Sequence, residues 1–138
     1  MPQTSKEMLI NMKSKKYFDI VFGLSENAPY AKKIIVDIEN NFPDAVPDNR
    51  GTKQHQQPDF VFRINGHNFF RITKSCSIDF FLKNGASYDL INQCSEKSSH
   101  SHNISGSSFK KLSLSEYKII LDHIGVSYHI VKNKYKKN

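Results

Sequence analysis

Residues 57–75 read QPDFVFRINGHNFFRITKS, and this stretch decides the fold. Two apolar runs rich in Phe, Ile and Val lie on either side of Asn65-Gly66, the residue pair favoured in two-residue type I′ turns. The pattern therefore predicts a β-hairpin with its turn at these two residues. Counting outward from the turn, the expected cross-strand pairs are Ile64–His67, Phe62–Phe69 and Asp59–Ile72.

The open end of the hairpin is expected to bring an acid and a lysine together. Successive side chains of a strand point to opposite faces, so the even spacings place Asp59, Ile72 and Lys74 on one face. Asp59 and Lys74 could carry chemistry there. The alternative is an ordinary surface salt bridge between them, which contributes at most about 1 kcal/mol.

Pro58-Asp59, the hairpin after it and Lys74-Ser75 resemble the motif of the PD-(D/E)XK nuclease superfamily, which includes restriction enzymes, Holliday-junction resolvases and nuclease toxins. The family has an acid two residues before the lysine, where this chain has Ile72. Later segments are also similar, so the resemblance spans residues 17–132. It implies a restriction-endonuclease-like α/β fold, with a mixed central β-sheet built around the hairpin and flanked by helices.

The resemblance also implies a small metal-dependent endonuclease that hydrolyses phosphodiester bonds of DNA or RNA. Such enzymes hold Mg²⁺ (or Mn²⁺) on carboxylates, and the metal polarises the phosphate and lowers the pKa of its bound water. By this resemblance Asp59 is the primary metal ligand and the backbone carbonyl of Thr73 is a further ligand. Lys74 is then the catalytic lysine that orients the nucleophile and offsets negative charge in the transition state.

The position of Ile72 leaves the metal site one acid short. Family members often take a further acid from the first helix, and Glu39 is expected in that role, with Glu26 and Asp37 as alternates. Glu39 follows Ile38 by one residue, about 100° around the helix axis, at the border of the apolar stripe. If no acid reaches the site, the chain would be a catalytically inactive nuclease-fold protein that binds nucleic acid.

The formal charge of +7, from 20 Lys and Arg against 13 Asp and Glu, predicts a polyanionic partner, either DNA or RNA. A protein-protein interaction module with an acidic partner is the alternative. The expected phosphate-binding residues lie in the loop, hairpin and tail: Arg50, Lys53, Arg63, Arg71, Lys132 and Lys134. Phe60, Phe69 and Phe70 lie among these cations and are either core residues or rings that stack on bases.

The 138 residues suit one nuclease-like domain, with a polar N-terminal segment at 1–16 and a basic tail at 132–138. No apolar run is long enough to cross a membrane, and the first residues lack the apolar stretch of a signal peptide, so a cytoplasmic location is expected. Two further partners stay open: a second copy in a homodimer, and an inhibitor or immunity protein if the chain is a toxin.

Hydrophobic periodicity and turn residues predict the remaining elements. Helices are expected at 27–41 and 86–93, and a third begins at Ser113 or Ser115 and ends at Gly125. Strands are expected at 16–24, 78–82 and 126–131, and loops at 42–57 and 95–108.

Overall fold

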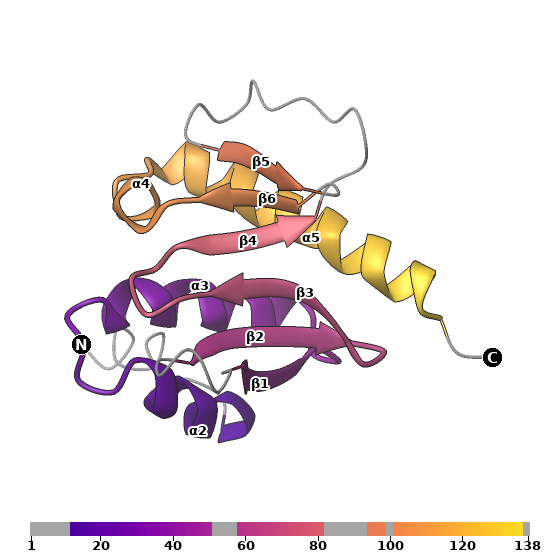
Figure 1. The fold of residues 1–138 in the computed structure, drawn as a ribbon, viewed down its shortest axis with the longest axis horizontal. Helices are drawn as coiled ribbons and strands as arrows, with labels where there is room; N and C mark the ends of the chain where they lie inside the picture. Colours follow the sequence, from indigo (N-terminus) through magenta and orange to yellow (C-terminus); the bar gives the residue numbers. More distant parts are fainter. Residues whose placement is uncertain (1–11, 51–57, 82–93, 99–100, 137–138) are drawn as a thin grey trace.

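The computed structural model describes residues 12–50, 58–81, 94–98 and 101–136 (Figure 1). The helices are α2 (Met12–Val21), α3 (Ala28–Asn41), α4 (Gly106–Lys110) and α5 (Leu114–Lys134). The strands are β1 (Val46–Arg50), β2 (Asp59–Ile64), β3 (His67–Ile72), β4 (Ile78–Phe81), β5 (Cys94–Ser98) and β6 (Ser101–Ile104). Three predictions lie outside the described residues: the helix at 86–93, Lys53 and most of the segment 1–16.

The sheet has the strand order β1-β2-β3-β4-β6-β5, and each neighbouring pair in it is antiparallel. An α/β protein with a sheet packed against helices is confirmed, but the expected mixed sheet is wrong. An antiparallel neighbour needs only a short turn, whereas a parallel neighbour needs a crossover of about a dozen residues or more. Residues 126–131, expected to return to the sheet after a helix, belong to α5 instead.

The hairpin of β2 and β3 forms around the predicted turn. Asn65 and Gly66 both have positive φ, 52° and 83°, as a type I′ turn requires, and Ile64 pairs with His67. A bulge then shifts the register between Phe62 and Arg63, and the observed pairs are Arg63–Asn68, Phe62–Phe70, Val61–Arg71 and Phe60–Ile72. The predicted pairs Phe62–Phe69 and Asp59–Ile72 are therefore wrong. One extra residue in β3 turns every later side chain of that strand to the other face.

The hydrophobic core lies between the sheet and the helices α3 and α5, which cover one face of it (Figure 1). From the sheet it contains Phe60, Phe62, Phe69, Phe70, Ile72, Ile78 and Phe80, and from the helices Ile34, Ile35, Ile38, Ile120 and Ile124, each at most 1% exposed. Full burial of one such side chain contributes roughly 1.5–3 kcal/mol. Phe60, Phe69 and Phe70 are therefore core residues and not base-stacking rings.

The alternating apolar residues at 16–24 predict a strand, but residues 12–21 form helix α2. The side chains that are buried recur at helical spacing: Ser14, Phe18, Val21 and Phe22. Ile20, which the alternation would place beside them, is 48% exposed. Only Phe18 and Phe22 of the alternating residues belong to the buried stripe of the helix, and their spacing of four suits a helix as well as a strand.

Helix α5 begins as predicted and continues further than predicted. The Ser113 hydroxyl accepts a hydrogen bond from the Glu116 N–H, and the Glu116 carboxylate accepts one from the Ser113 N–H, which makes a capping box. The helix does not end at Gly125, so the strand at 126–131 is wrong. Its buried stripe continues from Ile124 past the glycine to Ser127, Tyr128 and Val131.

The other predictions are mixed. The helix at 27–41 is confirmed as α3 and the strand at 78–82 as β4. The predicted loops at 42–57 and 95–108 are partly wrong, because the first contains β1 and the second contains most of β5, all of β6 and the start of α4. Among the described residues no helix has the length and hydropathy needed to cross a membrane.

Candidate functional site

A row of register-paired residues crosses five of the strands on the face opposite α3 and α5. In order from β1 to β6 it reads Asp48, Val61, Arg71, Asp79 and Asn103. Directly opposite residues on neighbouring strands have Cβ atoms about 4.5–5.5 Å apart, within reach of each other's side chains. The middle of the row is therefore a polar network and not an apolar surface.

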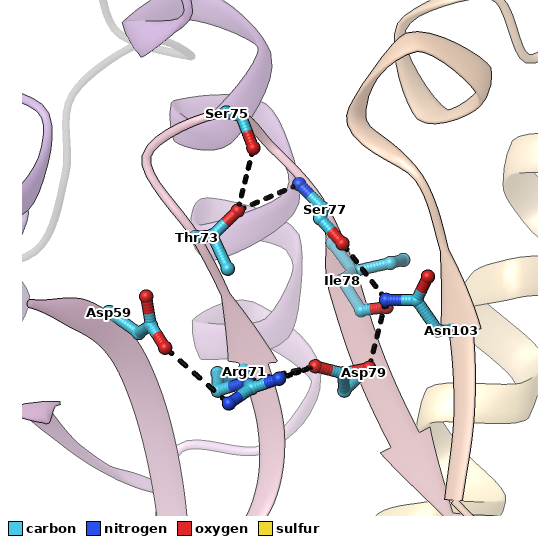
Figure 2. A network of polar contacts seen from close by, with 8 residues as sticks. All are labelled: Asp59, Arg71, Thr73, Ser75, Ser77, Ile78, Asp79 and Asn103. Carbon is cyan, nitrogen blue, oxygen red and sulfur yellow. Dashed lines mark hydrogen bonds and ion pairs between the residues drawn. The ribbon is translucent and has the colours of Figure 1, made fainter. Parts of the chain in front are cut away.

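Arg71 lies between two carboxylates in this network (Figure 2). Its Nε and Nη2 both donate to Oδ2 of Asp79, the former at 2.8 Å, and its Nη1 lies 3.5 Å from Oδ2 of Asp59. The exposed fractions of the three side chains are 30% for Arg71, 25% for Asp59 and 11% for Asp79. Hydrogen bonds between ionised groups are about twice as strong as neutral ones, so the guanidinium holds Asp79 firmly, while Asp59 is attracted to it by a longer ion pair.

The amide of Asn103 engages the other oxygen of Asp79. Its Nδ2 lies 2.9 Å from Oδ1 of Asp79, 2.9 Å from Oγ of Ser77 and 3.0 Å from the Ile78 carbonyl oxygen (Figure 2). An amide nitrogen has two hydrogens to donate, so these three acceptors share them. Asp79 is thus bonded from both sides, by β3 and by β6.

Thr73 closes the turn between β3 and β4. Its N–H donates to the Ser77 carbonyl at 2.9 Å, and its carbonyl accepts from the Cys76 N–H at 2.8 Å. Its hydroxyl accepts from the Ser77 N–H at 3.1 Å. Both backbone polar groups of Thr73 are therefore used within the turn.

The residues of the predicted metal site do not fit Mg²⁺ or Mn²⁺. The carboxylate of Asp59 is paired with Arg71, and the carbonyl of Thr73 is bonded inside the turn. The exposed Lys74 lies in the turn beyond the end of β3, and Ile72 faces the core. Within the described ranges, no three His, Cys, Asp or Glu side chains are grouped closely enough to hold a metal ion. A guanidinium lies where a divalent cation would need to bridge the two acids.

Glu39 lies far from Asp59. It is near the C-terminal end of α3, on the helix-covered side of the sheet. This helix starts beside the β3–β4 turn, where the Asn27 side chain donates to the Lys74 carbonyl at 3.0 Å, and it rises about 16 Å from Ala28 to Glu39. Asp59 is at the start of β2, close to that turn and on the opposite face. The expected supply of an acid by Glu39 is therefore not supported.

Three of the predicted phosphate-binding residues are ion-paired within the chain. Arg63 lies 3.5 Å from the carboxylate of Asp48, and Arg71 is paired with Asp79. Lys132 lies 3.1 Å from Asp44, which also accepts a hydrogen bond from the Tyr128 hydroxyl. That hydrogen bond is the largest cause of a lowered pKa of Asp44. These three cations are less available to an external phosphate than the sequence suggested.

A second group of cations gathers at one end of the sheet. Here β1 and β3 end, β2 and β4 begin, and α3, α4 and α5 have their first turns (Figure 1). Arg50 pairs with the first residue of β2, Lys74 lies in the β3–β4 turn, and Lys110 and Lys111 close α4. We call Arg50, Lys74, Lys110 and Lys111 the basic end. The sequence interpretation found Arg50 but missed the lysine pair before the Ser113 cap.

The side chain of Asn27 forms hydrogen bonds with two residues of the basic end. Its Nδ2 donates to the Lys74 carbonyl at 3.0 Å, and its Oδ1 accepts from the Lys110 ammonium at 2.9 Å. The side chain thus links the start of α3, the turn and α4. Helix α4 also packs closely on the turn, since a Cβ at Gly106 would lie 1.9 Å from the Ser75 carbonyl oxygen.

Comparison of the chain with protein-family models, curated proteins and solved structures found no match. The resemblance to PD-(D/E)XK nucleases therefore stays a prediction from Pro58-Asp59 and Lys74.

Proposed function

We propose that this chain binds nucleic acid through phosphate contacts at the basic end, without metal-dependent cleavage at Asp59. The supporting observation is the convergence of Arg50, Lys74, Lys110 and Lys111 from three separate segments of the chain onto one end of the sheet. Phosphate contacts by Lys and Arg supply most of the affinity in sequence-independent binding.

The partners of these cations support the proposal. Within the part of the chain that is described, none of the four forms an ion pair with a carboxylate, in contrast to Arg63, Arg71 and Lys132. The ammonium of Lys110 is bonded to the neutral amide of Asn27. Lys74 is anchored through its backbone carbonyl, which leaves its exposed side chain available to a ligand. Within the described residues, the positive charges of the basic end are therefore not neutralised by ion pairs.

The network around Arg71 favours binding without hydrolysis. Hydrolysis by the family that the sequence resembles needs carboxylates that hold a divalent metal. In this chain Arg71 supplies the positive charge between Asp59 and Asp79. A guanidinium cannot activate a water as a bound metal does. Of the two nucleic-acid hypotheses, a protein that binds without cleaving is therefore better supported than an active nuclease.

The test is fluorescence anisotropy with a labelled DNA duplex, and with single-stranded DNA and RNA, over a range of salt. Log K should fall linearly with log salt, with a slope of about −0.9 per phosphate neutralised on duplex DNA. Lys74→Gln/Lys111→Gln should weaken binding and reduce that slope. The matched control is Lys134→Gln/Lys136→Gln, which removes the same charge from the C-terminal end of α5 and the residues after it.

Equal losses in the two double variants would show that net charge alone drives binding and that the basic end has no special part. Binding that is absent at low salt, or does not change with salt, would overturn the proposed function and favour a protein partner.

A further inference from the structure

A groove of about 430 Å³ opens at the basic end between α3, α4 and the first turn of α5. Its main lining residues are Tyr30, Lys33, Phe109, Lys110, Leu114 and Tyr117. The volume lies in the range of small-molecule sites, which is about 300–1,000 Å³. The groove is separate from the Arg71 network, which is on the opposite face of the sheet.

The walls of the groove are apolar and aromatic. Phe109 and Tyr117 are 6% and 8% exposed and form buried walls, whereas Tyr30 and Leu114 are 46% and 66% exposed. A tyrosine of α3 and a leucine of α5 thus line the groove while exposed to solvent. A flat ring placed between them would cover apolar surface that water now contacts.

The rim of the groove is cationic. The Lys33 ammonium lies 4.7 Å from the centroid of the Tyr117 ring, and that of Lys110 lies 6.0 Å from the centroid of the Tyr30 ring. Lys33 is also 3.7 Å from Asp37, but its side chain remains 57% exposed. Among the described residues no acidic side chain lines the groove, although Asp37 lies beside it and accepts a hydrogen bond from the Tyr117 hydroxyl. An anionic group at the rim would therefore meet two positive charges.

We propose that this groove binds one nucleotide, with the base between Tyr30 and Leu114 and the phosphate between Lys33 and Lys110. An apolar ring joined to an anion matches both halves of the groove. The inference rests on the proposed function, in which the nucleotide belongs to a nucleic-acid strand; a free nucleotide is the other source of the same chemistry. Bases in a duplex are stacked and paired, so the groove favours single strands.

The first experiment compares binding of a labelled single-stranded oligothymidylate and of a duplex of equal length. Loss of an aromatic–base stack by alanine substitution corresponds to at least about a fivefold loss of affinity. Tyr30→Ala should therefore weaken single-strand binding by about fivefold or more and leave duplex binding within about twofold. Tyr30→Phe keeps the ring and should bind the strand as wild type does.

The charge of the rim is tested with a matched pair of lysines. Lys33→Gln should weaken single-strand binding more than Lys118→Gln, which removes the same charge from an exposed position of α5 outside this groove. Equal losses would show that Lys33 acts only through net charge, and the assignment of the phosphate to this rim would be wrong.

A titration with thymidine monophosphate identifies the source of the nucleotide. Shifts in the backbone NMR signals of Tyr30, Lys33 and Leu114 that vanish in Tyr30→Ala would support a site for free nucleotide. If thymidine monophosphate causes no shifts but Tyr30→Ala still weakens single-strand binding, the groove binds a nucleotide of a nucleic-acid strand.

The two proposals fail in different ways. If Tyr30→Ala changes neither strand binding nor the nucleotide shifts, the groove proposal is wrong, while duplex binding that depends on Lys74 and Lys111 would still support the proposed function. If wild type binds neither strand nor duplex, the proposed function is wrong. The groove proposal then stands if thymidine monophosphate still shifts the NMR signals of Tyr30, Lys33 and Leu114, and it is wrong if those signals do not shift.

Discussion

Arg71 and Asp79 are bonded side by side across β3 and β4, in the middle of the polar face of the sheet. The bulge in the hairpin causes this arrangement, because it places Arg71 on the face of Asp59 and turns Ile72 into the core. An unbulged hairpin would have placed Ile72 beside Asp59, as the sequence pattern implied. The pair therefore replaces the predicted metal site with a structural ion pair.

Arg71→Met should destabilise the fold by roughly 1–3 kcal/mol, because it leaves Asp79, only 11% exposed, without its cation. Urea unfolding measures the free energy. The control is Arg63→Met. The side chains of Arg63 and Asp48 are 37% and 36% exposed, so the ion pair that this variant removes should contribute less than about 1 kcal/mol. Asp79→Asn in the Arg71→Met background should recover part of the loss. Equal effects of the two arginine variants would contradict a structural role for Arg71.

Plasmid DNA and bulk RNA should stay intact with Mg²⁺, Mn²⁺ or EDTA. Asp59 is paired with Arg71, and the described residues contain no group of three His, Cys, Asp or Glu side chains that could hold a metal ion. Ile72→Glu should not create activity, because the side chain is fully buried in the core and a carboxylate there would destabilise the fold. Agarose gels measure cleavage, and circular dichroism measures whether Ile72→Glu remains folded. If wild type cleaves with a divalent metal and Asp59→Ala does not, the hypothesis of a metal-dependent nuclease would be supported instead.

Gly125→Ala should stabilise the protein by up to about 1 kcal/mol, because glycine is costly inside a helix and the new Cβ would lie 3.4 Å from Cζ of Phe42, close to an ordinary contact. Gly106→Ala should have the opposite effect and cost about 1–3 kcal/mol, because the new Cβ would overlap the Ser75 carbonyl oxygen. Thermal unfolding of the two variants tests both. A destabilised Gly125→Ala would mean that Phe42 cannot move aside.

Cys76 should react slowly with thiol reagents in the native protein. Burial raises the pKa of its thiol from 9.0 to about 11, so at about pH 8 the reactive thiolate is roughly a hundredfold rarer than in the unfolded chain. The rate should rise with pH toward that pKa and should increase sharply in denaturing urea. The measurement uses Cys94→Ser, so that Cys76 is the thiol observed. Fast native labelling at neutral pH would show that the β3–β4 turn opens readily.

The sequence by itself determined the elements that depend on local chemistry. Asn65-Gly66 accepts the positive φ angles of a type I′ turn, and Ser113 with Glu116 starts α5 through a capping box. The apolar stripe at Ile34 and Ile38 marks α3. The positive charge that motivates a polyanionic partner is likewise a property of composition.

Only the tertiary structure decided the register of β3 and the neighbours of Asp59. A bulge depends on which register buries Phe69 and Phe70 together, a long-range packing effect that no local pattern encodes. Packing also carries α5 through Gly125, because the residues beyond it complete a buried stripe. The basic end exists for the same reason: Lys74 and Lys110 are distant in sequence, and the fold brings them to one side chain, Asn27. Local preferences thus set the hairpin turn, the cap of α5 and the apolar stripe of α3, while packing decided the length of α5 and which charged groups meet.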